Sequence, residues 1–285
     1  MGLCRHDDVG LYSVSVFEHL PVPWRSELSA SNEILDEIAY LERFENIDVL
    51  FAAEAGSRAW GFDSPDSDYD IRFVYKRRIP DYLRLDGRSD TVDWKNGDLD
   101  MSGWDLDKFL RLVRGSNPSA FEWLGSPIIY RENAHWDLVR KLSNKCFDPV
   151  SAAHHHVGMA RSTMKAHFKG DSVPAKRYLY VIRSIFAGTY ALRHFKQIPV
   201  PFAELYQDQY WQLDSDISNA IDGLLEQKRS NRENDVQMRN DGLEEWIDDS
   251  LRDIEVKARD YRHSEKPPWS EFDLIFLKFL GILSV

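Results

Sequence analysis

Residues 47–53 form a short apolar run with β-branched side chains, the pattern of a buried strand, and a Gly56-Ser57 pair follows this run closely. Ten residues then separate Ser57 from Asp68. Asp68 and Asp70 open a second apolar run, which is again typical of a strand. This order predicts two strands of a sheet, with a glycine-serine turn after the first and two carboxylates at the start of the second.

A hairpin signal follows these two strands. The second strand is expected at residues 69–75, and residues 91–94 and 99–101 then flank an Asn96-Gly97 pair. Asn-Gly between short runs of this kind is a strong signal for a tight hairpin turn. We therefore expect two further strands to pair here, which makes the sheet mixed.

Helical spacing accounts for most of the remaining chain. Residues 31–44 repeat apolar side chains three and four positions apart, and residues 106–113 do so again before Gly115. From about residue 134 the pattern is helical, and we expect helices at residues 152–168, 175–195, 209–228 and 243–262. We predict an α/β (α+β) domain with a mixed sheet at residues 1–133, followed by an all-helical C-terminal domain at residues 134–285.

The composition excludes several classes of protein. The net charge of -11 disfavours general adhesion to DNA or anionic lipid, so any site for a polyanion has to be a local patch. The two cysteines are too few for a disulfide framework or a four-thiolate zinc site. Residues 1–20 lack the apolar core of a secretory signal, and the apolar run at residues 272–285 is too short to span a bilayer. We therefore expect a cytoplasmic protein with no membrane partner.

The glycine-serine pair and the two aspartates suit phosphoryl transfer. At Gly56 the absence of a side chain lets backbone N–H groups approach a triphosphate, and the hydroxyl of Ser57 adds a donor. Because alternate residues of a strand point to the same face, Asp68 and Asp70 can share divalent cations. Two Mg²⁺ ions held by such carboxylates stabilise the attacking and leaving oxygens of an in-line displacement.

A third carboxylate is expected from a neighbouring strand. Asp100 is our choice, because it lies on the second strand of the hairpin and its neighbours Leu99 and Met101 place apolar side chains on the opposite face. Asp98 shares the face of Asp100 but lies in the turn, and it is the runner-up. Gly-Ser or Asp-x-Asp alone is usually an ordinary surface turn. The specificity of the pattern comes from the joint order of all three elements.

Together these residues resemble the motif of the DNA polymerase β-like nucleotidyltransferase superfamily, in which Asp-x-Asp follows Gly-Ser by about ten residues. More narrowly, the chain is similar to the RlaP family of bacterial and phage nucleotidyltransferases associated with RNA repair. The segments that carry this likeness are residues 56–61, 98–106, 116–118, 122–124, 176–183 and 199–202. The resemblance covers roughly residues 51–205, and Ser184 stands where the family usually has proline.

The resemblance implies transfer of a nucleoside monophosphate from an NTP, with ATP as the expected donor, to a hydroxyl group. This is an EC 2.7.7-type reaction that depends on Mg²⁺ or Mn²⁺. Asp68 and Asp70 are then metal ligands, and Asp100 is the third ligand or the general base. Ser57 would bind the terminal phosphates. Arg58 is a candidate phosphate clamp, although an arginine after a turn is as often a structural residue.

A basic zone lies inside this acidic chain. Residues 151–200 contain eight Lys or Arg and one Asp, a net charge of +7. Lys176, Tyr180 and Arg183 share one helical face and combine positive charge with a ring for stacking, so we include all three among the candidate nucleotide-binding residues. The zone predicts binding of phosphates, either of the NTP or of an RNA acceptor. The alternative is that these cations pair with carboxylates of the first domain.

Several other interpretations are weighed against these. Trp60 is the tryptophan expected at the edge of the site. Residues 154–156 are three consecutive histidines, which point about 100° apart on a helix and cannot all bind one zinc ion. An RNA end is the expected acceptor, with a protein hydroxyl or a small molecule as the alternative. A non-catalytic nucleotide-binding or antitoxin-like interaction module remains a second class of function, against which the complete set of three aspartates argues.

Overall fold

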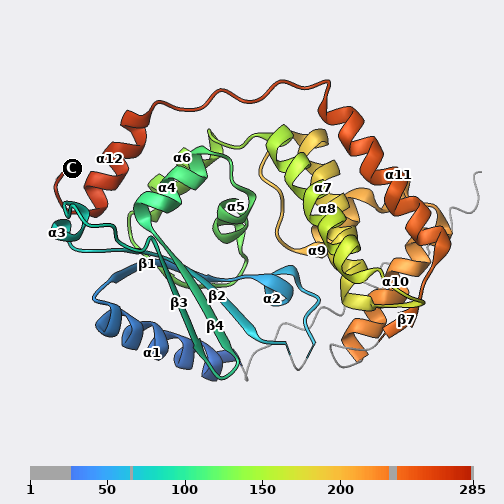
Figure 1. The fold of residues 1–285 in the computed structure, drawn as a ribbon, viewed down its shortest axis with the longest axis horizontal. Helices are drawn as coiled ribbons and strands as arrows, with labels where there is room; N and C mark the ends of the chain where they lie inside the picture. The colour runs from blue at the N-terminus through green and yellow to red at the C-terminus, as the bar shows by residue number, and fades with distance from the viewer. Residues whose placement is uncertain (1–26, 65–66, 231–235, 284–285) are drawn as a thin grey trace, which may run out of the picture.

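The computed structural model describes residues 27–64, 67–230 and 236–283. A five-stranded sheet with helices on both faces forms one side of the molecule, and a group of packed helices forms the other (Figure 1). We call these the sheet region and the helical region. The predicted order, a mixed α/β sheet followed by helices, is confirmed.

The sheet has the strand order β3-β4-β2-β1-β5. Its strands are β1 (Asp48–Glu54), β2 (Tyr69–Lys76), β3 (Thr91–Asn96), β4 (Leu99–Asp105) and β5 (Ile129–Glu132). β2 and β4 run parallel, and the other neighbouring strands run antiparallel. The parallel register sets Asp70 directly opposite Asp100.

Helices cover both faces of the sheet because each presents an apolar stripe to it. Ile38 of α1 is fully buried against one face, and Phe109 of α4 and Trp136 of α6 fill a second core on the other. The helices of the sheet region are α1 (Glu27–Glu45), α2 (Gly56–Trp60), α3 (Ile79–Tyr82), α4 (Leu106–Arg114), α5 (Pro118–Gly125) and α6 (Trp136–Asn144).

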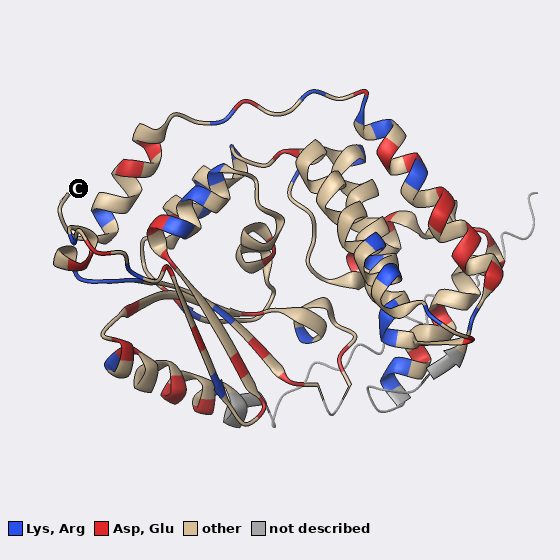
Figure 2. Ribbon diagram, in the orientation of Figure 1, with Lys and Arg blue, Asp and Glu red and all other residues tan. Residues whose placement is uncertain are grey.

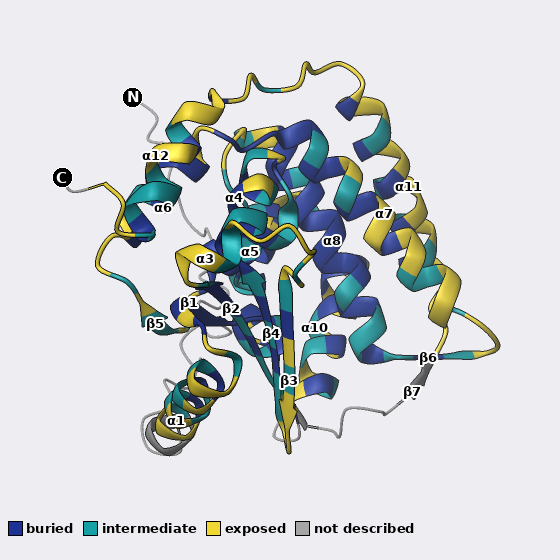
Figure 3. Ribbon diagram, turned by 60° about the vertical axis from the view of Figure 1, so that its left-hand side comes forward, coloured by how far each residue is buried: buried dark blue, intermediate teal, exposed yellow. Residues whose placement is uncertain are grey.

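The helical region is built around α8, which is buried along most of its length (Figure 3). Helices α7, α9, α10 and α11 all pack against it. The elements are α7 (Pro149–His167), β6 (Ser172–Pro174), α8 (Ala175–His194), α9 (Phe202–Gln209), the short 3-10 helix η2 (Tyr210–Gln212), α10 (Ser215–Ser230), β7 (Val236–Met238) and α11 (Asp241–Ala258). None of the helices that the structure describes is long and apolar enough to cross a membrane.

The last helix, α12 (Trp269–Phe279), returns to the sheet region. Residues 259–268 run from the end of α11 across the molecule to α12 (Figure 1). His263 Nδ1 and the Ser264 N–H fasten this strap to the carboxylate of Asp148, at 2.8 and 3.2 Å. Helix α12 then packs on α4 and α6. Both α6 and α12 therefore share a core with the sheet, and the predicted domain boundary after residue 133 stays a prediction.

Candidate active site

The structure brings Asp70 and Asp100 together on adjacent parallel strands, where both face the same side of the sheet. The guanidinium of Arg72 lies between them. It donates to Asp70 Oδ1 at 3.0 Å and to the Asp100 carbonyl at 3.0 Å, and lies 3.4 Å from Asp100 Oδ1. Arg72 was not among the predicted site residues, although it continues the alternation of Asp68 and Asp70 along the strand.

The charges around Asp70 fit a cation site. Burial raises the pKa of Asp70, the ion pair with Arg72 lowers it, and the charges of Asp100 and Asp68 raise it further. Asp68 and Asp100 therefore each lie close enough to Asp70 to repel its negative charge, and a divalent cation would relieve that repulsion. Among the described residues, no three His, Cys, Asp or Glu side chains are placed closely enough to hold a metal ion. Arg72 is the cation that the pair contacts in this structure.

Gly56 touches Asp70 directly. Its φ of 61° lies in the left-handed region, and a Cβ at this position would come within 2.3 Å of Asp70 Oδ2. The glycine-serine pair, which the sequence predicted as a turn, begins the one-turn helix α2. Ser57 is buried in this first turn, and its carbonyl accepts hydrogen bonds from the N–H groups of Gly61 and Phe62.

Arg58 holds the loop that leads to Asp68. Its guanidinium donates to the carbonyl of Ser67 at 2.8 Å and to the carbonyl of Asp68 at 3.3 Å, and it lies 4.0 Å from the ring centre of Tyr69. These contacts use Nε and one terminal nitrogen of the guanidinium, and the role of Arg58 as a phosphate clamp stays a prediction. The structure therefore places Arg58 as a support of the Asp68 loop, and Asp68 itself is exposed. Asp98, the runner-up for third carboxylate, is exposed in the β3–β4 turn.

Glu54 is a second residue that the sequence did not single out. It ends β1, and only 1% of its surface is exposed. Its carboxylate accepts the backbone N–H of Asp70 at 2.7 Å and the hydroxyl of Tyr130. Burial raises the pKa of Glu54 to about 6, although both hydrogen bonds act in the opposite direction. The available signal was a charged residue at the end of an otherwise apolar strand.

The helical region meets the site at α2. Trp60 donates from Nε1 to Glu122 Oε1 at 2.5 Å. The Tyr180 ring packs edge-on against the Trp60 ring, with 5.0 Å between the ring centres. Arg183 lies 4.2 Å above the Trp60 ring and donates to the Val200 carbonyl at 3.1 Å. With 4% of its surface exposed, Arg183 does not belong to an exposed basic stripe, and Trp60, at 9%, is not an open platform for a base.

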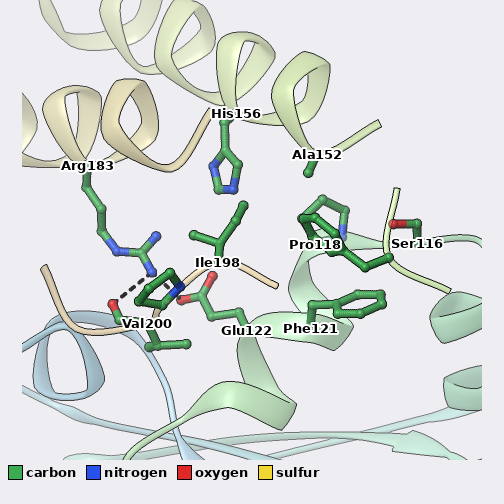
Figure 4. A pocket seen from close by; sticks show the side chains of 11 residues that line it. Ser116, Pro118, Phe121, Glu122, Ala152, His156, Arg183, Ile198 and Val200 are labelled. Carbon is green, nitrogen blue, oxygen red and sulfur yellow. Dashed lines mark hydrogen bonds and ion pairs between the residues drawn. The ribbon is translucent and has the colours of Figure 1, made fainter. Parts of the chain in front are cut away.

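A small cavity at this junction is lined mostly by apolar side chains, and Glu122, His156 and Arg183 bring polar groups to it from both regions. In Figure 4, Arg183 and His156 point from α8 and α7 toward Glu122 of α5. Burial above all, and then the charges of Arg183 and His155, hold the pKa of His156 well below its usual range. His156 is therefore a neutral junction residue, and we find no reason to assign it to a metal.

Lys and Arg gather at the end of α7 and the start of α8, as Figure 2 shows. The pKa of His167 is lowered by loss of hydration and by the charges of Arg177, Lys169 and Lys176. These cations are therefore close neighbours in space, and we call Lys169, Lys176 and Arg177 the basic cluster. Lys176 is half-buried and lies on the face of α8 that carries Tyr180.

Two comparisons with known proteins agree with this geometry. Residues 30–278 match the model of the RlaP family, described as the RNA repair pathway DNA polymerase beta family. An uncharacterized protein of Bacillus subtilis (strain 168), YcgL, is 34% identical over 246 residues, which is 86% of this chain and 94% of the relative. The resemblance predicted from the motifs is confirmed, and the match extends beyond residue 205, where no motif had been placed.

Proposed function

Because this chain belongs to the RlaP family, the RNA repair pathway DNA polymerase beta family, we propose that it is a nucleotidyltransferase that moves a nucleoside monophosphate from an NTP to a hydroxyl at an RNA end. The observation that carries this proposal is the register of β2 and β4, which sets Asp70 opposite Asp100 next to Gly56. Paired carboxylates beside a close-packed glycine suit an NTP whose phosphates are bound with divalent cations.

The residues have distinct roles in this proposal. Asp68 and Asp70 would hold Mg²⁺ or Mn²⁺, which would neutralise charge on the phosphates. Asp100 takes the proton of the acceptor hydroxyl, or completes the ligand set. The acceptor oxygen then bonds to the α-phosphorus of the NTP, the bond from that phosphorus to the bridging oxygen of the β-phosphate breaks, and pyrophosphate leaves. The start of α2, with Gly56 and Ser57, faces the remaining phosphates.

The basic cluster supports RNA as the acceptor. An acidic chain that concentrates Lys and Arg at one place, with Lys169 exposed and Lys176 and Arg177 half-buried, offers a local site for a polyanion. Arg183 is excluded from that site by its burial, so the cluster consists of Lys169, Lys176 and Arg177. A protein hydroxyl or a small molecule as acceptor would not require this cluster.

The test is incorporation of label from each α-³²P-labelled NTP in the presence of Mg²⁺ or Mn²⁺, with total RNA and, separately, lysate protein as acceptors. We expect label in RNA, with ATP as the preferred donor. The Asp70→Asn variant is the matched control and should give none. Label in protein alone would replace the proposed acceptor, and no label in any fraction would favour a binding module over an enzyme.

A further inference from the structure

Three consecutive residues at the end of β1 contact Asp70. The Glu54 carboxylate accepts the Asp70 N–H at 2.7 Å, and the Ala55 N–H donates to the Asp70 carbonyl at 2.8 Å. Gly56 packs so closely on the Asp70 carboxylate that it has no room for a Cβ. The backbone on both sides of the Asp70 Cα and the side chain itself are thus fixed by one short segment.

The hydrogen bond to the Glu54 side chain replaces a backbone hydrogen bond between β1 and β2. In a regular antiparallel ladder, the carbonyl of Ala55 would accept the N–H of Asp70, because these residues form a hydrogen-bonded pair. The chain instead leaves β1 after Glu54 to begin α2, and the Asp70 N–H bonds to a side chain in place of this carbonyl. The side chain of Glu54 reaches across and supplies the missing acceptor.

Glu54 is itself held from several directions. Its second carboxylate oxygen accepts the hydroxyl of Tyr130, its N–H donates to the Ile128 carbonyl at 2.9 Å, and its carbonyl accepts Ser126 Oγ at 2.6 Å. Burial of a carboxylate costs free energy of folding, whereas burial of an apolar residue at the same strand end would not. Neither of its side-chain hydrogen bonds is needed for the apolar core, and one of them ends on the backbone of Asp70.

We propose that Glu54 is a positioning residue for the metal ligand Asp70, acting through the hydrogen bond that its carboxylate accepts from the Asp70 N–H. The inference rests on the proposed function, because it concerns the same cation site. Removal of the acceptor leaves the Asp70 N–H unpaired at the start of β2 and loosens the backbone that carries the Asp70 carboxylate. Supporting residues of this kind set the affinity of the site for its metal.

The test is the dissociation constant of Mn²⁺, measured by electron paramagnetic resonance of the free ion, for the wild type and two variants of similar volume. Glu54→Met removes the acceptor and should weaken Mn²⁺ binding by about 10- to 100-fold. Glu54→Gln retains an oxygen that can accept the Asp70 N–H, and should stay within about threefold of the wild type. Retained Mn²⁺ affinity in Glu54→Gln, beside a loss in Glu54→Met, would separate positioning of Asp70 from a general loss of stability.

Asn240→Ala is the structural control, because it removes the hydrogen bond that caps α11 and lies outside the segments that contact Glu54 or Asp70. It should lower the melting temperature and leave Mn²⁺ affinity unchanged. Wild-type Mn²⁺ affinity in a folded Glu54→Met variant would overturn the inference. A loss of Mn²⁺ affinity in Glu54→Gln as large as that in Asp70→Asn would also overturn it. The second comparison can be made even if Glu54→Met does not fold. Equal Mn²⁺ binding by the wild type and Asp70→Asn would overturn the proposed function as well.

Discussion

Asp70 is the residue on which the contacts of the site converge, since Glu54, Gly56 and Arg72 all touch it. Asp70→Asn keeps the size of the side chain and an oxygen that can accept from Arg72, so we expect the variant to fold. The loss of a metal ligand should lower transfer by about 10²-fold or more. The measurement is label incorporation beside a melting curve. Near-wild-type turnover in the folded variant would refute the assignment of Asp70.

Gly56 offers a second test at the scale of one residue. Gly56→Ala meets two obstacles, a positive φ and an Asp70 oxygen 2.3 Å from the new Cβ. We expect a loss of stability of about 1–3 kcal/mol from the backbone strain, and weaker ATP binding because Asp70 and the start of α2 must shift. Chemical denaturation and calorimetry with ATP and Mg²⁺ measure the two effects.

Gly170→Ala is the control for this prediction. Gly170 also has a positive φ, at 73°, but a Cβ there meets no atom within 4 Å. Its replacement should cost stability through the backbone alone and leave ATP affinity unchanged. Equal ATP affinity in Gly56→Ala and the wild type would remove the start of α2 from the donor site.

At the scale of elements, the sequence predicted the strands and the hairpin because their signals are local. β1, β2 and the Asn96-Gly97 turn are each encoded within a few residues. The parallel pairing of β2 with β4 joins residues far apart in sequence and was not predicted. The choice of Asp100 depended on its place in the hairpin and on its apolar neighbours Leu99 and Met101. The short strand β5 was missed, because its four residues carry no alternation of buried and exposed side chains.

Helix α8 shows where periodicity misleads. Its basic and aromatic residues fall on one face, which suggested an exposed surface for RNA. Arg183 is in fact buried over the Trp60 ring, and the half-buried Tyr180 packs edge-on against the same ring, because α8 is the central helix of its region. Spacing along a helix identifies a shared face, but only the tertiary packing decides whether that face meets solvent. Glu54 and Arg72 escaped prediction for the same reason, since their partners come from other segments.

The basic cluster yields a prediction at the scale of α7 and α8. Replacement of Lys169 and Arg177 by Gln should weaken binding of single-stranded RNA and reduce the slope of log K against log salt by about 1.4, at roughly 0.7 for each phosphate that the variant no longer neutralises. Fluorescence anisotropy over a salt series measures the slope. The double variant of Arg193 and Lys196, at the other end of α8, removes the same charge and should leave the slope unchanged. The RNA assignment of the cluster fails if both double variants behave alike.

At the scale of the whole molecule, the site depends on the helical region. Trp60 and Phe62 come three and five residues after Ser57, yet their side chains belong to the core built around α8. The strap of residues 259–268 and α12 join the two regions a second time. A change at the junction should therefore lower the stability of the whole molecule. His156 is buried between the regions, so its protonation is one such change that can be measured.

His156 should make the stability of the whole molecule depend on pH. Burial first, and then Arg183 and His155, hold its pKa well below 6.5 in the folded protein, whereas the unfolded chain protonates this ring near pH 6.5. The unfolded state therefore binds the extra proton, and the free energy of unfolding falls as the pH drops below about 6.5, by up to about 1.4 kcal/mol per pH unit. Urea denaturation between pH 5.5 and 7.5 measures this slope. His156→Gln should reduce the slope of the unfolding free energy against pH by the contribution of one proton. His154→Gln replaces an exposed neighbour on α7 and should leave the slope unchanged. If the wild type and His156→Gln show the same slope, His156 is not the neutral, buried group that the junction requires.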